Sequence, residues 1–190
     1  MEEIHHAVSS RERLSALCRT GLMAAVTCIL APMTIPIGPV PISLTNLVVY
    51  LSLYLLGWKL ATTSILVYLM IGASGLPVFS GFTGGIGKLV GPTGGYLMGF
   101  VVIAVVSGMI VDRCSSRVVH FLGLVGGTAL CYVMGTAWFC YVTDSTVGSA
   151  LGLCVFPFIP LDLVKIALAI ALGPVIRTGL VKSGLIPTGK

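Results

Sequence analysis

The chain has 190 residues, of which 56% are hydrophobic and only 9% are charged, and its formal net charge is +5. A water-soluble domain normally carries about 25% charged residues, so this composition excludes a soluble domain of any size. The basic residues flank apolar segments and do not form one patch, which is typical of membrane topology and argues against nucleic-acid binding. The solvent of this protein is therefore lipid.

Charged residues are absent from 20–58, 60–87, 89–111 and 118–143. A helical membrane span needs about 20 apolar residues. We therefore predict an all-α membrane protein with one integral membrane domain over 1–190. Its six transmembrane helices are expected at about 14–33, 43–56, 60–73, 94–111, 118–142 and 160–180.

Residues 1–13 form a polar tail, in which the adjacent His5 and His6 make a poor metal site. A cleavable signal peptide has a basic start and a short apolar core, so we expect the first helix to be retained. That helix carries small residues at four-residue spacing, which allow close helix packing in lipid. The stripe is either an internal contact or a docking face for another membrane subunit, and it contains Gly21, Ala24, Ala25 and Cys28.

Two turns follow. Residues 33–41 form a proline-rich turn without charge, and 57–59 (Gly-Trp-Lys) form a tight turn with an aromatic residue and a cation at the interface. Asn46 lies in the first turn of the helix between them, where it either caps the helix or faces a cavity.

The later helices also have distinctive residues. Gly91, Gly95 and Gly99 share one face of the fourth helix, and a second small stripe on the fifth contains Gly123, Gly127, Cys131 and Gly135. Pro160 is a natural first-turn residue of the last helix, and Pro174 is expected to bend it. The six cysteines include no C-x-x-C pair, so we interpret them as packing residues.

The distribution of Lys and Arg predicts orientation. The N-terminal region, the 57–59 turn, the 112–117 turn and the C-terminal region together hold nine basic residues. The opposite side has only Lys88, with Lys165 set aside because it lies within a helix. By the positive-inside rule, both termini are cytoplasmic and the connection after the third helix faces outward.

That connection, within 75–100, holds nine glycines, two prolines and Lys88, but also many apolar side chains. A connection of this length is usually functional or disordered, and its apolar residues argue against disorder. We predict that 75–93 folds as a loop that caps a substrate cavity.

Asp162 and Lys165 lie three residues apart on one face of the last helix. Intramembrane charges are costly and usually functional, and the helix N-terminus favours Asp162 but not Lys165. The lysine therefore needs an anion, which is either Asp162 in a purely structural pair or the carboxylate of a ligand. Because a lone structural pair gains little over apolar packing, we favour a binding site.

Other side chains are candidates for the same cavity. Lys88 is either a second cation or solvated, whereas Tyr68, Tyr96 and Phe79 either line an apolar slot or pack in the core. Enzyme motifs are missing: 82–89 lacks the first glycine and the Ser/Thr of a phosphate loop, and no G-x-S-x-G elbow occurs.

The segments GLPVF and GPTGGY, joined by a glycine-rich run, and the FPFIPLDLVK segment resemble the BioY family. The resemblance covers the whole chain. It implies the substrate-binding (S) component of an energy-coupling factor (ECF) transporter in the cytoplasmic membrane, with biotin as the transported substrate, no cofactor and no enzymatic activity. The implied partners are a membrane T component and two cytoplasmic ATPases. The resemblance also implies that the small residues of the first helix are the docking face.

By motif position, the resemblance assigns Asp162 and Lys165 to the binding site and places Tyr96 and the cap residues from Phe79 to Gly85, including Thr83 and Gly84, around the pocket. Asn46 and Lys88 stand as guesses for polar residues that some members have. One alternative is a solitary biotin transporter without ATPases. Another is a small intramembrane enzyme acting on lipid, which the lack of a nucleophile–base set disfavours.

Overall fold

The computed structural model describes residues 2–35 and 40–186, with side chains described from Arg13 onward. It is mostly helical, as predicted, and it adds two short helices, where connections were expected, and an antiparallel hairpin of β1 (Thr34–Ile35) and β2 (Ile42–Ser43), in which Thr34 pairs with Ser43. β1 lies within the predicted 33–41 turn, of which 36–39 fall outside the described residues, whereas β2 follows that turn and includes Ser43, where the second helix was expected to begin. The helices are α1 (Glu2–Leu30), α2 (Thr45–Ala73), α3 (Ile86–Val90), α4 (Gly94–Arg113), α5 (Arg117–Thr143), α6 (Val147–Cys154) and α7 (Ile159–Lys182).

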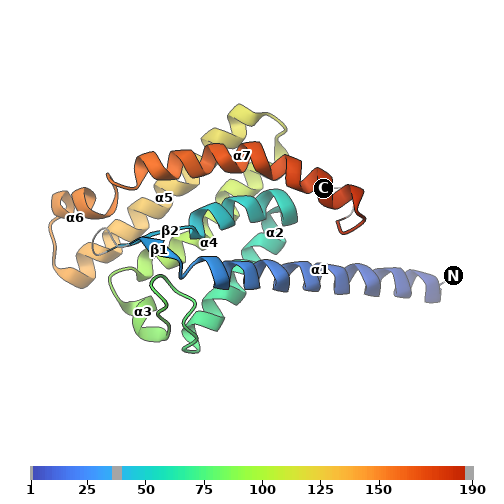
Figure 1. Ribbon diagram of the computed structural model, residues 1–190, viewed down its shortest axis with the longest axis horizontal. Helices are drawn as coiled ribbons and strands as arrows, with labels where there is room; N and C mark the ends of the chain where they lie inside the picture. The colour runs from blue at the N-terminus through green and yellow to red at the C-terminus, as the bar shows by residue number, and fades with distance from the viewer. Residues whose placement is uncertain (1, 36–39, 187–190) are drawn as a thin grey trace.

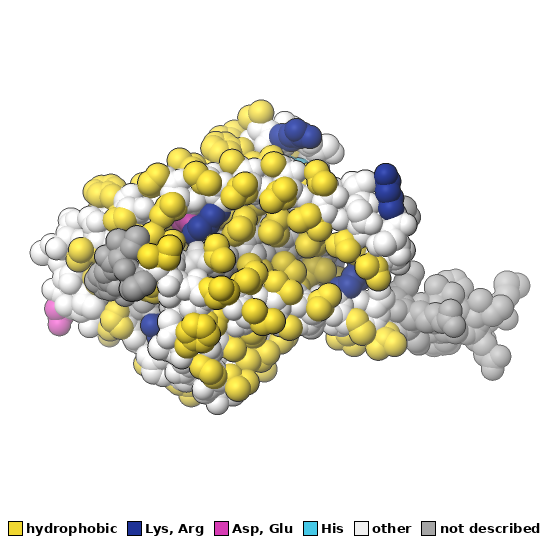
Figure 2. Space-filling view, in the orientation of Figure 1, with side chains coloured by type: hydrophobic (Ala, Val, Ile, Leu, Met, Phe, Trp, Pro, Cys, Tyr) yellow, Lys and Arg dark blue, Asp and Glu magenta, His cyan; other side chains and the backbone are white. Residues whose placement is uncertain are grey.

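The long helices run between two ends of the molecule (Figure 1). One end, here called the loop end, holds β1, β2, α3 and α6; the other, the terminal end, holds both ends of the chain. Hydrophobic side chains cover most of the face in Figure 2, and the separate basic side chains lie mainly toward the terminal end. This surface suits a lipid environment.

The predicted second and third helices form one element, α2, that breaks at Gly57. Gly57 has φ 76° and ψ 167°, a conformation that glycine tolerates and other residues rarely adopt. Both ends of α2 lie at the loop end, because the Gly81 N–H donates to Pro32 O and the Gly85 N–H to Gly72 O. Gly57 lines the same cavity as Arg19 of α1 and Arg177 of α7, away from the loop end, so α2 folds back on itself.

Five helices in the described ranges are long and apolar enough to cross a membrane, with α2 counted once. The structure therefore shows a multi-helix membrane protein without fixing the predicted six spans. One boundary differs clearly: α1 ends at Leu30 and not at 33, because Pro32 disfavours helix in the residue before it.

The small-residue stripes of α4 and α5 pack against each other. A Cβ added to Gly99 would lie 2.4 Å from the Cys131 sulfur, and one added to Gly95 would lie 2.4 Å from Trp138 Cβ. Small residues thus let the two helices approach closely, as expected in lipid. The buried core lies between α2, α4, α5 and α7.

The loop 75–93 is folded. Phe79 is fully buried, lies edge-on to Tyr68 with ring centroids 5.5 Å apart, and covers Gly72 so closely that an added Cβ there would overlap its ring. Phe79 and Thr83 also exchange backbone hydrogen bonds of 2.8 and 3.4 Å. Phe79 therefore anchors the loop to α2.

Candidate substrate-binding site

The two intramembrane charges of α7 pair with each other, which is one of the two alternatives left open by the sequence. Asp162 lies in the first turn of α7, and its Oδ1 accepts a hydrogen bond of 2.8 Å from Lys165 Nζ. Asp162 is only 2% exposed and Lys165 only 8%. Because burial removes both charges from water, each needs close partners.

Two further side chains complete the environment of Asp162. Its Oδ2 accepts 2.9 Å from Asn46 Nδ2 on α2 and 2.6 Å from the Tyr132 hydroxyl on α5. Asn46 therefore turns toward Asp162, and the structure shows no side-chain cap on α2. Three helices converge on one carboxylate; Asp162, Lys165, Asn46 and Tyr132 are called the carboxylate cluster below.

Tyr132 is the residue of the carboxylate cluster that sequence reasoning missed. It lies inside the apolar fifth helix, and a tyrosine buried there normally needs a partner for its hydroxyl. The need for such a partner was the signal in the sequence that could have identified Tyr132. It did not identify Asp162 as the partner, because the pair is separated by 30 residues.

The carboxylate cluster lines a cavity of about 50 Å³ at the loop end. Tyr96 and Phe100 of α4 also line it, and so do Val40 and Pro41, which precede β2. The Tyr96 hydroxyl lies 3.1 Å from Thr136 Oγ1. Ligand pockets usually enclose about 300–1,000 Å³, so this cavity must widen before a vitamin-sized molecule can enter.

Several other candidates lie outside this cavity. Tyr68 and Phe79 pack on each other below the loop. Thr83 and Lys88 line a separate groove of about 870 Å³ between the loop and the hairpin. Gly84 packs against the backbone of Leu76, and Gly85 has φ 91°. The structure thus brings Tyr96 and Asn46 to Asp162 and Lys165 but not these six residues.

The predicted docking stripe on α1 is divided between two faces. Ala24 is only 1% exposed and packs inside the chain, and Cys28 is partly buried. Gly21 and Ala25 are exposed. Ala24 therefore serves an internal contact, which leaves Gly21 and Ala25 accessible.

The geometry defines what the site can do chemically. An ammonium group has three N–H donors, and one of those on Lys165 points to Asp162. The remaining two have no acceptor among the described residues and can bond to an acceptor in the cavity. Asp162 already accepts three hydrogen bonds of the about four that a carboxylate can take. The site therefore offers mainly donors, on a rigid scaffold, to a ligand with acceptor oxygens.

Comparison with known proteins places this geometry in a family. The model of the BioY family matches residues 4–182. The chain is 38% identical over 154 residues to a protein of Thermotoga maritima named biotin transporter BioY, covering 80% of this chain and 90% of that protein. It is also 38% identical over 149 residues to a probable biotin transporter BioY of Pyrococcus horikoshii, covering 78% of this chain and 88% of that protein.

A solved structure has the same fold. It is the S-component for biotin from an ECF-type ABC transporter, and it matches with a TM-score of 0.81 at 26% identity, covering 88% of this chain and 93% of that one. Fold, length and sequence agree, and the chain belongs to the BioY family.

Proposed function

We propose that this protein binds biotin in the cavity of the carboxylate cluster and carries it across the cytoplasmic membrane as the S component of an ECF transporter. The observation that carries the proposal is the buried Lys165, which has two N–H groups free for a ligand after its bond to Asp162. Membership of the BioY family supports biotin as the ligand.

Biotin offers a carboxylate, a ureido carbonyl and two ureido N–H groups. The spare donors of Lys165 suit either of its acceptor groups. The ureido N–H groups suit the amide oxygen of Asn46 and the remaining acceptor position of Asp162. The fused rings and valeryl chain then contact apolar side chains such as Phe100 and Phe158, which line the cavity.

The fold supports six membrane crossings with both termini cytoplasmic. The two halves of α2 run in opposite directions between the ends of the molecule, so they count as two crossings together with α1, α4, α5 and α7. An even number returns the chain to its starting side, which agrees with both termini at one end in Figure 1. The basic residues at that end make it the cytoplasmic side.

In this orientation the loop 75–93 faces outward. It does not line the cavity itself but reaches the segment before the hairpin, where the Gly81 N–H donates to Pro32 O, and so forms an outer cover. Biotin entry then requires the loop end to open, because the cavity is only about 50 Å³. Outside the long helices, the wall of the cavity includes Pro41, just before β2, and Phe158, between α6 and α7. Phe79 keeps the loop itself attached to α2.

The partners in this proposal are a membrane T component and two cytoplasmic ATPases, which supply the energy. The exposed face of α1 suits docking of the T component, since Gly21 and Ala25 let a second helix approach closely. Ala24, which is buried, contributes only by holding α1 in place.

Binding of radiolabelled biotin to the purified protein in detergent tests the proposal, with riboflavin and thiamine as competitors. We expect saturable binding that resists both competitors and is lost in Lys165→Ala. Lys182→Ala, at the exposed end of the same helix, is the matched control. Absence of binding in a folded sample would refute biotin as the ligand, and full binding by Lys165→Ala would refute the site.

Biotin methyl ester identifies the ligand group that meets Lys165. If the ammonium group pairs with the carboxylate, the ester binds less tightly than biotin, and Lys165→Ala removes this difference. Uptake assays with and without the ATPases then separate an S component from a solitary transporter.

A further inference from the structure

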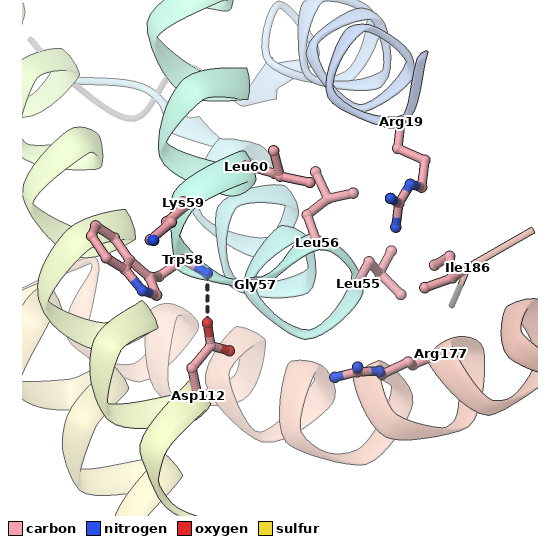
Figure 3. A pocket seen from close by; sticks show the side chains of 10 residues that line it. All are labelled: Arg19, Leu55, Leu56, Gly57, Trp58, Lys59, Leu60, Asp112, Arg177 and Ile186. Atoms are coloured by element: carbon pink, nitrogen blue, oxygen red, sulfur yellow. Dashed lines mark hydrogen bonds between the residues drawn. The ribbon is translucent and has the colours of Figure 1, made fainter. Parts of the chain in front are cut away.

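A second cavity, of about 480 Å³, lies at the terminal end of the molecule. Its wall combines α1, the Gly57 turn of α2, the end of α4 and α7, and it includes Arg19, Lys59 and Arg177. Figure 3 shows Arg19 and Arg177 reaching into it from facing helices, with Lys59 further along beside Trp58. Three cations from three helices thus surround one space.

The cations are not neutralised within the described part of the chain. None of the three forms a salt bridge with a described carboxylate. Arg19 Nε donates to Ser15 O at 3.1 Å, and Lys59 Nζ lies 5.7 Å from the centre of the Trp58 ring. The one carboxylate in the wall, Asp112, accepts 2.9 Å from the Trp58 N–H and so holds the α2 turn. Among the described residues, the wall of the cavity therefore carries three positive charges and one negative charge.

An apolar groove of about 530 Å³ adjoins this cavity. The two share Arg19, Leu55, Leu56 and Ile186 in their walls. The groove follows α1 from Ser15 to Leu30, which corresponds to about 22 Å along a helix axis. Its other wall comes from the first half of α2 and the end of α7, through residues such as Leu51 and Leu180.

We propose that the cavity and the groove together bind one anionic phospholipid. The phosphate lies between Arg19 and Arg177, where guanidinium groups can form paired hydrogen bonds with it, and one acyl chain lies along α1 in the groove. Basic pockets between membrane helices are suited to lipid head groups. The site is separate from the carboxylate cluster and does not depend on the ligand bound there.

The groove distinguishes a lipid from a small anion. Inorganic phosphate would satisfy the arginines but would leave about 530 Å³ of apolar groove uncovered. A zwitterionic lipid would fill the groove but would bring no net negative charge to three cations. Of these three ligands, only an anionic lipid matches both the basic cavity and the apolar groove.

Native mass spectrometry of the full chain in detergent tests the site with phosphatidylglycerol and phosphatidylcholine of equal chain length. We expect one phosphatidylglycerol molecule to be retained in preference to phosphatidylcholine. Affinity should fall about fivefold for Arg19→Gln or Arg177→Gln and about 30-fold for the double variant. The matched control is Arg117→Gln, an exposed arginine near the same end and outside the cavity.

Three results would overturn the proposal. The first is equal retention of the two lipids, and the second is an equal loss of lipid affinity in the control and the cavity variants. The third is displacement of the lipid by millimolar inorganic phosphate or by dihexanoyl phosphatidylglycerol, which would indicate a site for small anions. Biotin binding by each variant shows that it is folded. Loss of lipid preference with intact biotin binding supports the site, whereas failure of biotin as a ligand would leave the lipid result unaffected.

Discussion

The two ends of this molecule treat charge in opposite ways. At the loop end, Asp162 and Lys165 lie in a cavity of about 50 Å³, and Asp162 accepts three hydrogen bonds. At the terminal end, Arg19, Lys59 and Arg177 surround about 480 Å³ with one carboxylate among them. Buried charges must be paired at close range, whereas arginine and lysine near a membrane surface reach water or head groups.

This difference separates two tasks. Buried charges that are paired at close range act through a few strong hydrogen bonds, so single substitutions there should have large effects. A wide basic cavity attracts an anion through the combined charge of several residues, so each residue should contribute only a small part of the affinity. Substitutions at the two ends can therefore test the comparison directly.

The largest effect is expected for Asp162→Ala. The change leaves the Lys165 ammonium buried without its partner and removes the acceptor of Asn46 and Tyr132. Breaking a buried pair in this way typically costs about 3–5 kcal/mol. We expect a clear fall in Tm by fluorescence in detergent and loss of biotin binding. Asp144→Asn, at an exposed acid, is the control, and an unchanged Tm in Asp162→Ala would show that the site is hydrated.

Phe79→Ala should rank second and extends the comparison to the loop. Truncating a buried phenylalanine costs about 3–5 kcal/mol, and here the loss falls on the contact between the loop and α2. We expect faster biotin dissociation in a filter-binding chase, with a smaller change in Tm because the helices remain packed. Phe82→Ala, at an exposed loop residue, should leave the dissociation rate unchanged. Equal rates in the two variants would mean that the loop does not cover the ligand.

Much of this architecture was predictable because lipid simplifies the sequence pattern. Charge-free segments identified the long helices, the glycine stripes marked the faces of α4 and α5 that pack closely although not that they meet each other, and the lone intramembrane charges singled out Asp162 and Lys165. These signals are local, or they follow from the cost of burying charge.

Contacts that depend on distant parts of the chain were not predictable. Tyr132 meets Asp162 only because α5 and α7 converge, and Phe79 packs under the loop because Gly72 leaves room for its ring. The pairing of β1 with β2 also has no clear pattern in two-residue strands. The sequence could not distinguish Ala24 from its neighbours in the stripe, but its position around the helix axis places it against the rest of the chain.

Gly57→Ala should have an intermediate effect on stability. The substitution lies at the terminal end, where the comparison of the two ends otherwise predicts small effects of single substitutions. Its φ of 76° disfavours any other residue, and an added Cβ would lie 3.0 Å from Asp112 Oδ2. Strain of this kind costs about 1–3 kcal/mol, so we expect a lower Tm. Gly126→Ala, in α5 with open space around it, is the control and should not lower Tm. If both variants unfold alike, the turn does not depend on glycine.

Tyr132→Phe is the smallest and most selective change. It removes one hydrogen bond of 2.6 Å to Asp162 Oδ2 and leaves those from Asn46 and Lys165 in place. A hydrogen bond to a charged group contributes about 1.5–3 kcal/mol, so we expect biotin affinity to fall about tenfold, measured by equilibrium binding. Tyr141→Phe, at an exposed residue of the same helix, should bind normally. If Tyr132→Phe also binds normally, Asp162 is held by Asn46 and Lys165 alone, and the pairing that distinguishes the loop end requires only α2 and α7.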